Sequence, residues 1–238
     1  MDALLLRFDA PLMSFGAVVV DQHHPTWRFP GAAMLTGLLG NALGWDHSDT
    51  VRLQALQDRL HFAARWDVEP ELLIDYQTVD LGQSFLEGTG WTTRGRREDR
   101  GKGDATSATH IRFRHYWANG VATIALTLEG REPPSLEELE AALRHPARPL
   151  FLGRKPCLPA APLLLGRRSA ESLKGALAAE PLAAVGPRRS FGQRLPALWP
   201  LEEGEAAGTE ERYDVRDWAN NIHRGVRRYA VGWLEVST

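Results

Sequence analysis

HIRFRHYWANGVATIALTL, residues 110–128, is the stretch that decides the fold of this chain. Its first half alternates apolar residues with basic or aromatic ones, namely His110, Arg112, Arg114 and Tyr116. A period of two predicts a strand with one basic and aromatic face. The dipeptide Asn119-Gly120 follows, ahead of a second extended run over residues 121–128, and this signature predicts a β-hairpin.

A glycine-rich, basic segment comes immediately before this hairpin. It runs from about Leu81 to Arg112 and lacks the apolar periodicity needed to bury a core of its own, so its order must come from a partner. Its cations are Arg94, Arg96, Arg97, Arg100 and Lys102. A charge run can also be a solvated loop without a role. Because a basic strand face lies beside it, we expect a finger that holds single-stranded RNA.

Composition restricts the class of protein. The chain has 238 residues, 43% of them hydrophobic, enough for one large soluble domain or two small ones. The formal net charge is −2, so only the distribution of charge can support nucleic-acid binding. Cys157 is the only cysteine, which excludes an internal disulfide and a thiolate zinc cluster built from this chain alone. With no signal peptide and no membrane-length apolar run, the expected location is the cytoplasm.

The remaining periodicities predict a series of strands and helices. Ser135 and Glu138 form a capping box that starts a helix, which must end near Pro146. Strands are predicted at residues 4–8, 60–66, 72–78, 150–152 and 226–236, and helices at 31–43, 53–60 and 170–178. The basic stretch at 224–228 precedes the last strand. Gly37 and Gly40 leave one side of the first helix thin enough for a close approach.

This order predicts an α+β protein. Residues 1–153 match a ferredoxin-like unit, the layout of an RNA-recognition (RRM-like) module, with the basic finger inserted in mid-sheet. Beyond this point the composition becomes proline-rich and less regular. Residues 154–238 are therefore predicted to form a second, smaller and irregular domain, mostly of β-structure.

Enzyme signatures are scarce. The chain holds no HExxH motif, nucleophile elbow or P-loop, and no cofactor or metal is expected. His23 and His24 are adjacent, so a strand would point them to opposite faces. A metal-independent ribonuclease needs little more than a general base, a general acid and a cation, which Lys102, His110, His115 and Tyr116 could supply. His110 and His115 are predicted to face opposite sides of one strand, so binding is favoured over cleavage.

Aromatic residues near the cations are candidates for stacking on unpaired bases. Trp27, Trp91 and Tyr116 are the three, although each can equally be a packing residue. Trp27 is the most suggestive, because it stands beside Arg28 in a loop that leads into the first helix.

Five segments, taken in order, resemble a known family. They are PLMSFG (11–16), WRFPGAAMLTGLLGNALGW (27–45), DYQT (75–78), RFRHYWANG (112–120) and PLFLGRKPCLP (149–159). Together they resemble the Cas-five family of the RAMP superfamily, in its CasD-type branch from type I-E CRISPR Cascade complexes. The resemblance covers about residues 1–160.

The resemblance implies a RAMP fold in which the basic insertion is a thumb. Such a subunit caps the 5′ handle of the CRISPR RNA, lies against the backbone subunit CasC and contacts the large subunit CasA, with target DNA contacted only indirectly. Cleavage belongs to CasE, so a non-catalytic role is implied. A sister subtype's homologue does cleave the precursor, which keeps a metal-independent endoribonuclease as the alternative. A third possibility is an adaptor whose finger grips only protein, and Glu87, Glu98, Asp99 and Asp104 suit such contacts.

The expected RNA-binding residues combine the matched segments with the basic rows. They are Ser14, Gly16, Trp27, Arg28, Arg94, Arg96, Arg97, Arg100, Lys102, His110, Arg112, Arg114, Tyr116, Arg154 and Lys155. One departure from the family concerns the first helix, where Gly31, Ala32 and Ala33 replace polar residues. The main-chain amides there are expected to remain available to a phosphate.

Overall fold

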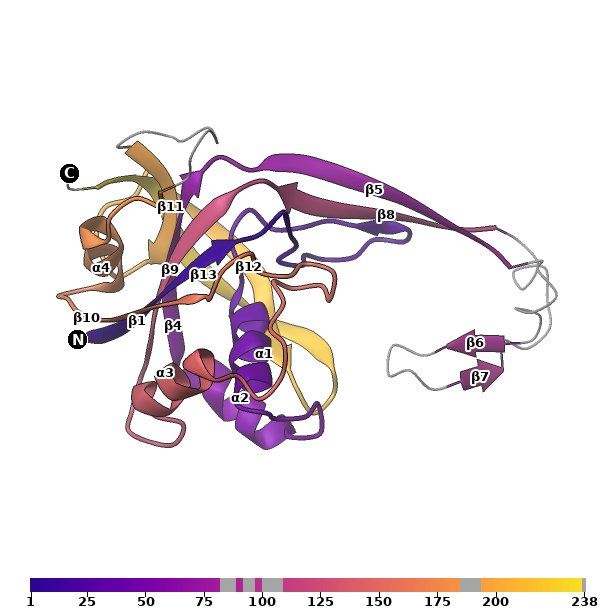
Figure 1. Cartoon of the computed structure of the whole chain (residues 1–238), viewed down its shortest axis with the longest axis horizontal. Coiled ribbons are helices and arrows are strands. Elements are labelled where there is room, and N and C mark those ends of the chain that lie inside the picture. The colour runs from indigo at the N-terminus through magenta and orange to yellow at the C-terminus, as the bar shows by residue number, and fades with distance from the viewer. Residues whose placement is uncertain (82–88, 92–96, 100–108, 185–193, 237–238) are drawn as a thin grey trace.

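A computed structural model describes residues 1–81, 89–91, 97–99, 109–184 and 194–236. The chain is a mixed α/β protein built on a mostly antiparallel sheet, from which a long two-stranded ribbon projects (Figure 1). The sheet has seven strands in the spatial order β10 (Leu164–Ser169), β1 (Asp2–Asp9), β9 (Val121–Leu128), β4 (Leu60–Val68), β11 (Arg194–Pro200), β13 (Ile222–Glu235) and β12 (Gly208–Asp217).

Helices cover both faces of this sheet. The period of two along β1 sends Leu4, Leu6 and Phe8 into one core and Ala3 and Leu5 into the other. The first core is covered by three helices, α1 (Ala32–Ala42), α2 (Thr50–Arg59) and α3 (Leu136–Arg144). The second is covered by α4 (Leu173–Ala179), on the opposite side (Figure 1).

Local sequence signals explain where these helices begin and how closely they pack. The predicted capping box at α3 is confirmed, because Ser135 Oγ accepts a hydrogen bond from the Glu138 amide at 3.2 Å and Glu138 Oε2 accepts one from the Ser135 amide at 2.7 Å. The close approach of a sheet or another backbone predicted at Gly37 and Gly40 of α1 is not found: a Cβ atom on Gly37 would meet only Trp218, at 3.8 Å, and Gly40 is approached by a side chain. A Cβ atom on Gly40 would lie 2.7 Å from Leu53 Cδ2 on α2.

The projecting ribbon is a continuation of two core strands. β4 leads into β5 (Glu71–Asp80), and β8 (Thr109–Ala118) leads into β9. Val68 lies opposite Val121 before the bend and Glu71 lies opposite Ala118 after it, so the pairing register continues through the bend. The ribbon is therefore one long antiparallel ladder that begins in the core.

The predicted Asn119-Gly120 hairpin is wrong. β8 and β9 belong to different sheets, and the dipeptide is the corner at which the ribbon leaves the core. Asn119 adopts the left-handed conformation that the signature suggested, with φ 59°. Gly120 is needed because a Cβ atom there would lie 2.7 Å from both Pro70 Cβ and Trp66 Cζ3 on the facing strand.

Short strands complete the ribbon. β2 (Leu12–Met13) and β3 (His23–His24) pair with β8 beside β5, and β6 (Thr89–Trp91) pairs with β7 (Arg97–Asp99). Four of the predicted finger cations, Arg94, Arg96, Arg100 and Lys102, lie outside the described residues. Arg97 lies in β7 and Trp91 in β6, where only the backbone is described.

Other predictions have mixed outcomes. The strand predicted at residues 150–152 is wrong, because the Leu152 amide donates to Cys157 and its carbonyl accepts from Ser14, which makes an irregular loop. Strands β10, β11 and β12 were not predicted. The domain boundary at residue 153 stays a prediction, and strands from both sides of it share the seven-stranded sheet. In the described part of the chain, no helix is long and apolar enough to span a membrane.

Candidate nucleic-acid interface

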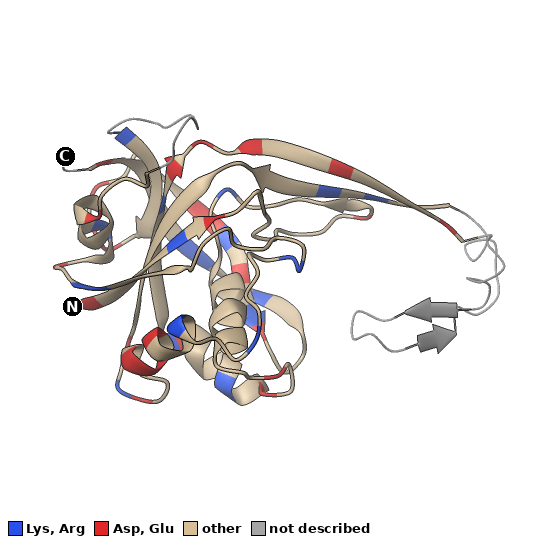
Figure 2. Ribbon diagram, in the orientation of Figure 1, with Lys and Arg blue, Asp and Glu red and all other residues tan. Residues whose placement is uncertain are grey.

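The two faces of β8 differ as its alternation predicts. Phe113 stacks on His23 of β3, with ring centroids 4.8 Å apart, and packs against Tyr76 of β5 on the same face. Arg112 and Arg114 lie on the other face. There, burial first, and then the charges of Arg112, Arg154 and Arg114, lower the pKa of His24. Three arginines thus act electrostatically on one imidazole beside the basic face of β8. Figure 2 shows where the lysines and arginines lie along the chain.

Arg154 joins the loop after α3 to this face. Its guanidinium donates to the carbonyls of His115 at 3.1 Å and His24 at 3.0 Å, and it lies 4.7 Å from the centre of the Tyr116 ring. Tyr116 is only 3% exposed, so a base could stack on it only if Arg154 moved. Its role in binding RNA stays a prediction.

Gly153 fixes the same loop against the segment that carries Ser14. Its φ is +93°, and a Cβ atom there would lie 1.6 Å from the Ser14 carbonyl oxygen. The Ser14 amide donates to the Leu152 carbonyl at 3.1 Å alongside. Because only glycine permits this approach, the LGRK motif has a geometric role in holding Ser14 and Arg154 together.

These residues line one end of a large groove. Its volume is about 930 Å³, and it contains four of the predicted RNA-binding residues, Ser14, Gly16, Arg154 and Lys155. The hydroxyl of Ser14 is buried without a hydrogen-bond partner among the described residues. Lys155 is exposed. These four of the fifteen predicted residues thus lie in one concave site, although the positions are far apart along the chain, and their role in binding RNA stays a prediction.

Trp27 and Arg28 lie in the loop between this groove and α1. The Trp27 amide donates to Gly16 at 2.8 Å, and its carbonyl accepts from the Trp117 indole at 2.7 Å. Arg28 is exposed, and its carbonyl accepts from the Trp66 indole at 3.0 Å. The Arg28 side chain is thus exposed on a loop whose backbone is tied to the core, whereas Trp27 is half-buried and packs against that core.

Arg212 and Asp214 of β12 hold the end of this loop. Arg212 is fully buried, donates to the carbonyls of Phe29 at 2.8 Å and Pro30 at 3.0 Å, and lies 5.4 Å from the Trp27 ring. Asp214 Oδ2 accepts from the Ala32 amide at 2.8 Å. No sequence signal links residues so distant, and sequence reasoning missed both.

The expected phosphate site at the start of α1 is therefore wrong for Ala32. A carboxylate of the same chain already accepts its amide, and Asp214 is only 4% exposed. A Cβ atom on Gly31 would lie 3.0 Å from Asp214, which explains a small residue at this helix start. Burial raises the pKa of Asp214.

The basic stretch at 224–228 contributes little free charge. Arg224 pairs with Asp217 at 3.7 Å and Arg228 with Glu211 at 2.7 Å, whereas Arg227 donates to the carbonyls of Leu60 and Gln57. These donors serve the fold, so this stretch is a poor nucleic-acid surface.

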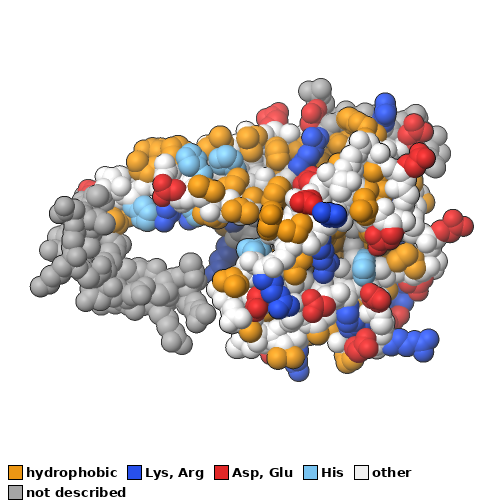
Figure 3. All heavy atoms as spheres, turned by 180° about the vertical axis from the view of Figure 1, so that it is seen from behind, with side chains coloured by type: hydrophobic (Ala, Val, Ile, Leu, Met, Phe, Trp, Pro, Cys, Tyr) orange, Lys and Arg blue, Asp and Glu red, His pale blue; other side chains and the backbone are white. Residues whose placement is uncertain are grey.

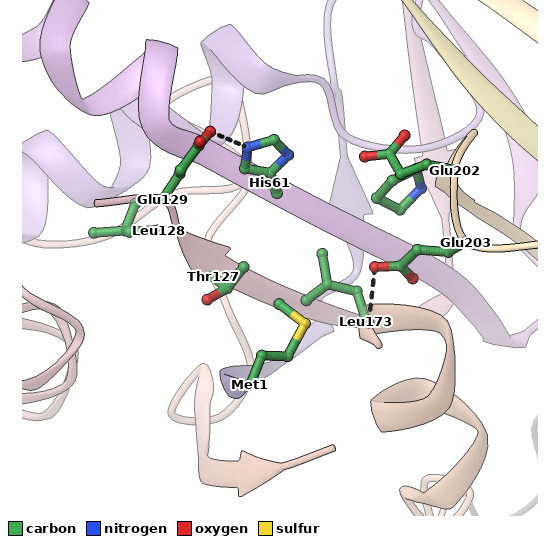
Figure 4. Close-up of a pocket in the computed structure, with 9 residues that line it drawn as sticks. Met1, His61, Thr127, Leu128, Glu129, Leu173, Glu202 and Glu203 are labelled. Carbon is green, nitrogen blue, oxygen red and sulfur yellow. Dashed lines mark hydrogen bonds and ion pairs between the residues drawn. The ribbon is translucent and has the colours of Figure 1, made fainter. Parts of the chain in front are cut away.

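A second, smaller pocket lies elsewhere on the sheet (Figure 4). His61 contacts Glu129 at 3.4 Å, and Glu203 accepts from the amides of Leu173 and Lys174. Glu202 also lines it. Carboxylates repel phosphate, so the cation-lined groove is the better candidate. Among the described residues no cluster of His, Cys, Asp or Glu could hold a metal ion.

Known proteins resemble this chain in sequence and in fold. The chain matches, over residues 3–230, the model of the family described as "CRISPR-associated protein (Cas_Cas5)". It is 35% identical over 178 residues to the "CRISPR system Cascade subunit CasD" of Escherichia coli (strain K12), covering 73% of this chain and 75% of that protein.

Two solved structures are similar throughout. A chain of a "CRISPR RNA-guided surveillance complex" matches with a TM-score of 0.69 and 26% identity, covering 98% of this chain and 90% of that one. A "Crystal structure of Cas protein" matches with a TM-score of 0.60 and 25% identity, covering 98% and 94%. Because the family model spans nearly the whole chain and the fold agrees, the protein belongs to the CRISPR-associated Cas-five family.

Proposed function

We propose that this protein is a CRISPR RNA-binding, CasD-type subunit of a Cascade surveillance complex, and that it holds the 5′ handle without cutting it. The observation that carries the proposal is the groove in which Ser14, Gly16, Arg154 and Lys155 meet beside the basic face of β8. Guanidinium and ammonium groups beside aromatic side chains suit a single-stranded backbone with unpaired bases. The relative from E. coli is named as a Cascade subunit.

The fold supports this assignment in finer detail. β1, β4, β9 and β10 occur in this order along the chain with helices after the first and third, and they stand in the sheet as β10-β1-β9-β4. We assign these four strands to the ferredoxin-like RAMP unit and the ribbon and its tip to the thumb. Because β10 belongs to the first unit, we place the boundary after Ser169 and assign the residues that follow to a small, mostly β domain.

The ribbon also supports contacts with neighbouring protein subunits. Opposite its basic face, Leu72, Ile74 and Tyr76 are between 53% and 55% exposed, beside Phe113 and Trp117. Figure 3 shows hydrophobic and histidine side chains gathered along the ribbon. An exposed apolar row of this kind marks an interaction surface. We assign the apolar face to the backbone and large subunits, CasC and CasA, and the basic face to RNA, with a cytoplasmic location.

The endoribonuclease alternative has weaker support. A general acid and a general base must both reach one phosphate. His110 lies opposite Val79 and His115 opposite Ile74, so the two imidazoles face opposite sides of the ribbon. This arrangement supports binding without cleavage.

Incubation of the purified chain with repeat-derived RNA in EDTA tests the proposal. We expect binding, with the RNA recovered intact. Replacing Arg112, Arg114 and Lys155 together with alanine should weaken binding and lower the single-strand salt slope by roughly 0.7 for each phosphate that is no longer neutralised. The matched control Arg228→Ala removes a cation already paired with Glu211 and should change neither. RNA cleavage that requires His110 or His115 would establish the alternative, and an unchanged slope in the triple variant would exclude this surface.

A further inference from the structure

The groove continues beyond the predicted RNA-binding residues. From Gly16 and Lys155 it runs along α1 to a second end, where Trp45 and Arg148 face the β12–β13 turn. That turn contributes Arg216, Trp218 and His223. None of these five residues was expected to bind RNA, and none serves the assigned interface.

Arg216 is the distinctive group at the second end. Its Nη2 donates to Asn221 Oδ1, its guanidinium lies 5.1 Å from the Trp218 ring, and its Nε is buried without a partner among the described residues. Burial lowers its pKa, and no ion pair to Arg216 is found among the described residues. A half-buried guanidinium without a carboxylate partner favours an anion that can accept from it.

The other cation at this end differs. Arg148 donates to the carbonyls of Gly44 and Trp45 and pairs with Asp46 at 2.7 Å, so its donors serve the fold. His223 lies opposite Arg216 in the β12–β13 register. Arg216 is thus the cation with capacity for a ligand, and His223 lies next to it.

The wall between the two ends suits an extended strand. Ala33, Gly37 and Asn41 line the groove from successive turns of α1. A Cβ atom on Gly37 would meet only Trp218, at 3.8 Å, so small residues leave this side of the groove open. The eleven residues of α1 span roughly 16 Å, and Trp218 lies beside this helix at Gly37, near its middle.

We propose that Arg216, with His223 beside it, forms a second phosphate-binding subsite for the same single-stranded RNA. The inference rests on the proposed function, because it needs RNA at the Lys155 end. RNA is favoured over an acidic peptide because the groove is continuous, with cations at both ends and the aromatic rings of Trp45 and Trp218 at the second end. A strand held at Lys155 can follow α1 and place a later phosphate beside the Arg216 guanidinium.

Oligonucleotide length distinguishes the two ends. The full chain is titrated by fluorescence anisotropy with a labelled uridine dinucleotide as the short RNA and a labelled oligouridylate of about 12 nucleotides as the long RNA. Arg216→Ala should weaken binding of the long RNA about tenfold, lower its salt slope by roughly 0.7, and leave the short RNA unchanged. Arg216→Lys should restore the slope while affinity stays reduced, because lysine lacks the planar fork.

Controls separate failure of the subsite from failure of the function. Arg224→Ala removes an exposed cation that pairs with Asp217 and does not line the groove, and it should bind both RNAs normally. Lys155→Ala should weaken both lengths. If Arg216→Ala binds both RNAs normally, or if its affinity for both falls equally, the proposed subsite is wrong. Weaker RNA binding by Lys155→Ala would still support the proposed function. If Lys155→Ala also binds RNA normally, the proposed function itself is wrong. If Arg216→Ala selectively loses binding of an acidic peptide, the second end of the groove binds protein.

Discussion

Replacing Gly153 with alanine should both destabilise the protein and disrupt the RNA groove. The new Cβ atom would lie 1.6 Å from the Ser14 carbonyl oxygen. The two segments must open by about 1.8 Å to restore an ordinary contact of 3.4 Å. This movement breaks the 3.1 Å hydrogen bond from the Ser14 amide to the Leu152 carbonyl, and it separates Ser14 from Arg154.

The cost has two parts. Alanine in a left-handed conformation costs roughly 1–2 kcal/mol. Losing a buried hydrogen bond and forcing the segments apart adds roughly 1–3 kcal/mol. We therefore expect Gly153→Ala to lower the free energy of unfolding by about 2–5 kcal/mol.

Gly204 provides the matched control. Its φ is +105°, close to the +93° of Gly153, but a Cβ atom there would meet nothing within 4 Å. Gly204→Ala should therefore lower the free energy of unfolding only by the cost of the left-handed backbone conformation, roughly 1–2 kcal/mol. Urea unfolding of both variants measures the difference, and RNA binding by Gly153→Ala should fall while Gly204→Ala binds normally. Equal destabilisation of the two variants would refute the close approach between Gly153 and Ser14.

Three further perturbations test other parts of the fold. Burial raises the pKa of Asp214 above 3.8, so protonated Asp214 contributes its full stabilisation below pH 3.8, and this stabilisation is lost as the pH rises through the pKa of the folded state. In Asp214→Asn the urea midpoint should therefore depend less on pH over that range. Parallel pH profiles of the variant and the wild type would contradict this. Gly120→Ala should cost roughly 1–3 kcal/mol by thermal unfolding, because its Cβ would lie 2.7 Å from Pro70, and a variant as stable as wild type would exclude the tight corner. Arg65→Leu should cost roughly 3–5 kcal/mol, because it leaves buried Asp67 without its 2.7 Å partner, and a decrease under 1 kcal/mol would show that Asp67 is satisfied by other groups.

Short-range signals in the sequence predicted local structure well. The Ser135 and Glu138 side chains are three residues apart, and the helix they cap begins at Leu136, where the pattern placed it. The alternation along β8 also predicted its two unlike faces, because side-chain direction in a strand depends only on position. These features depend on neighbours within one turn or one strand.

Pairing between distant strands was beyond the same reasoning. Asn119-Gly120 carries a hairpin signature, but Val121 pairs with Val68 and Ala118 with Glu71. The dipeptide satisfies a left-handed turn in both arrangements, so its conformation does not identify the partner strand. β11 was not predicted, and its place between β4 and β13 depends on contacts far along the chain.

Charge in the sequence also needed the structure to be interpreted. The arginines at 224–228 look as basic as Arg216, but Arg224 and Arg228 pair with carboxylates and Arg227 serves two carbonyls. Arg216 lines the groove, and its Nε has no hydrogen-bond partner among the described residues. A formal net charge of −2 is compatible with an RNA site because acidic side chains such as Glu210 and Glu211 neutralise arginines away from that groove. What determines phosphate binding is whether a guanidinium still has a donor to give, and this depends on partners that the tertiary fold brings together.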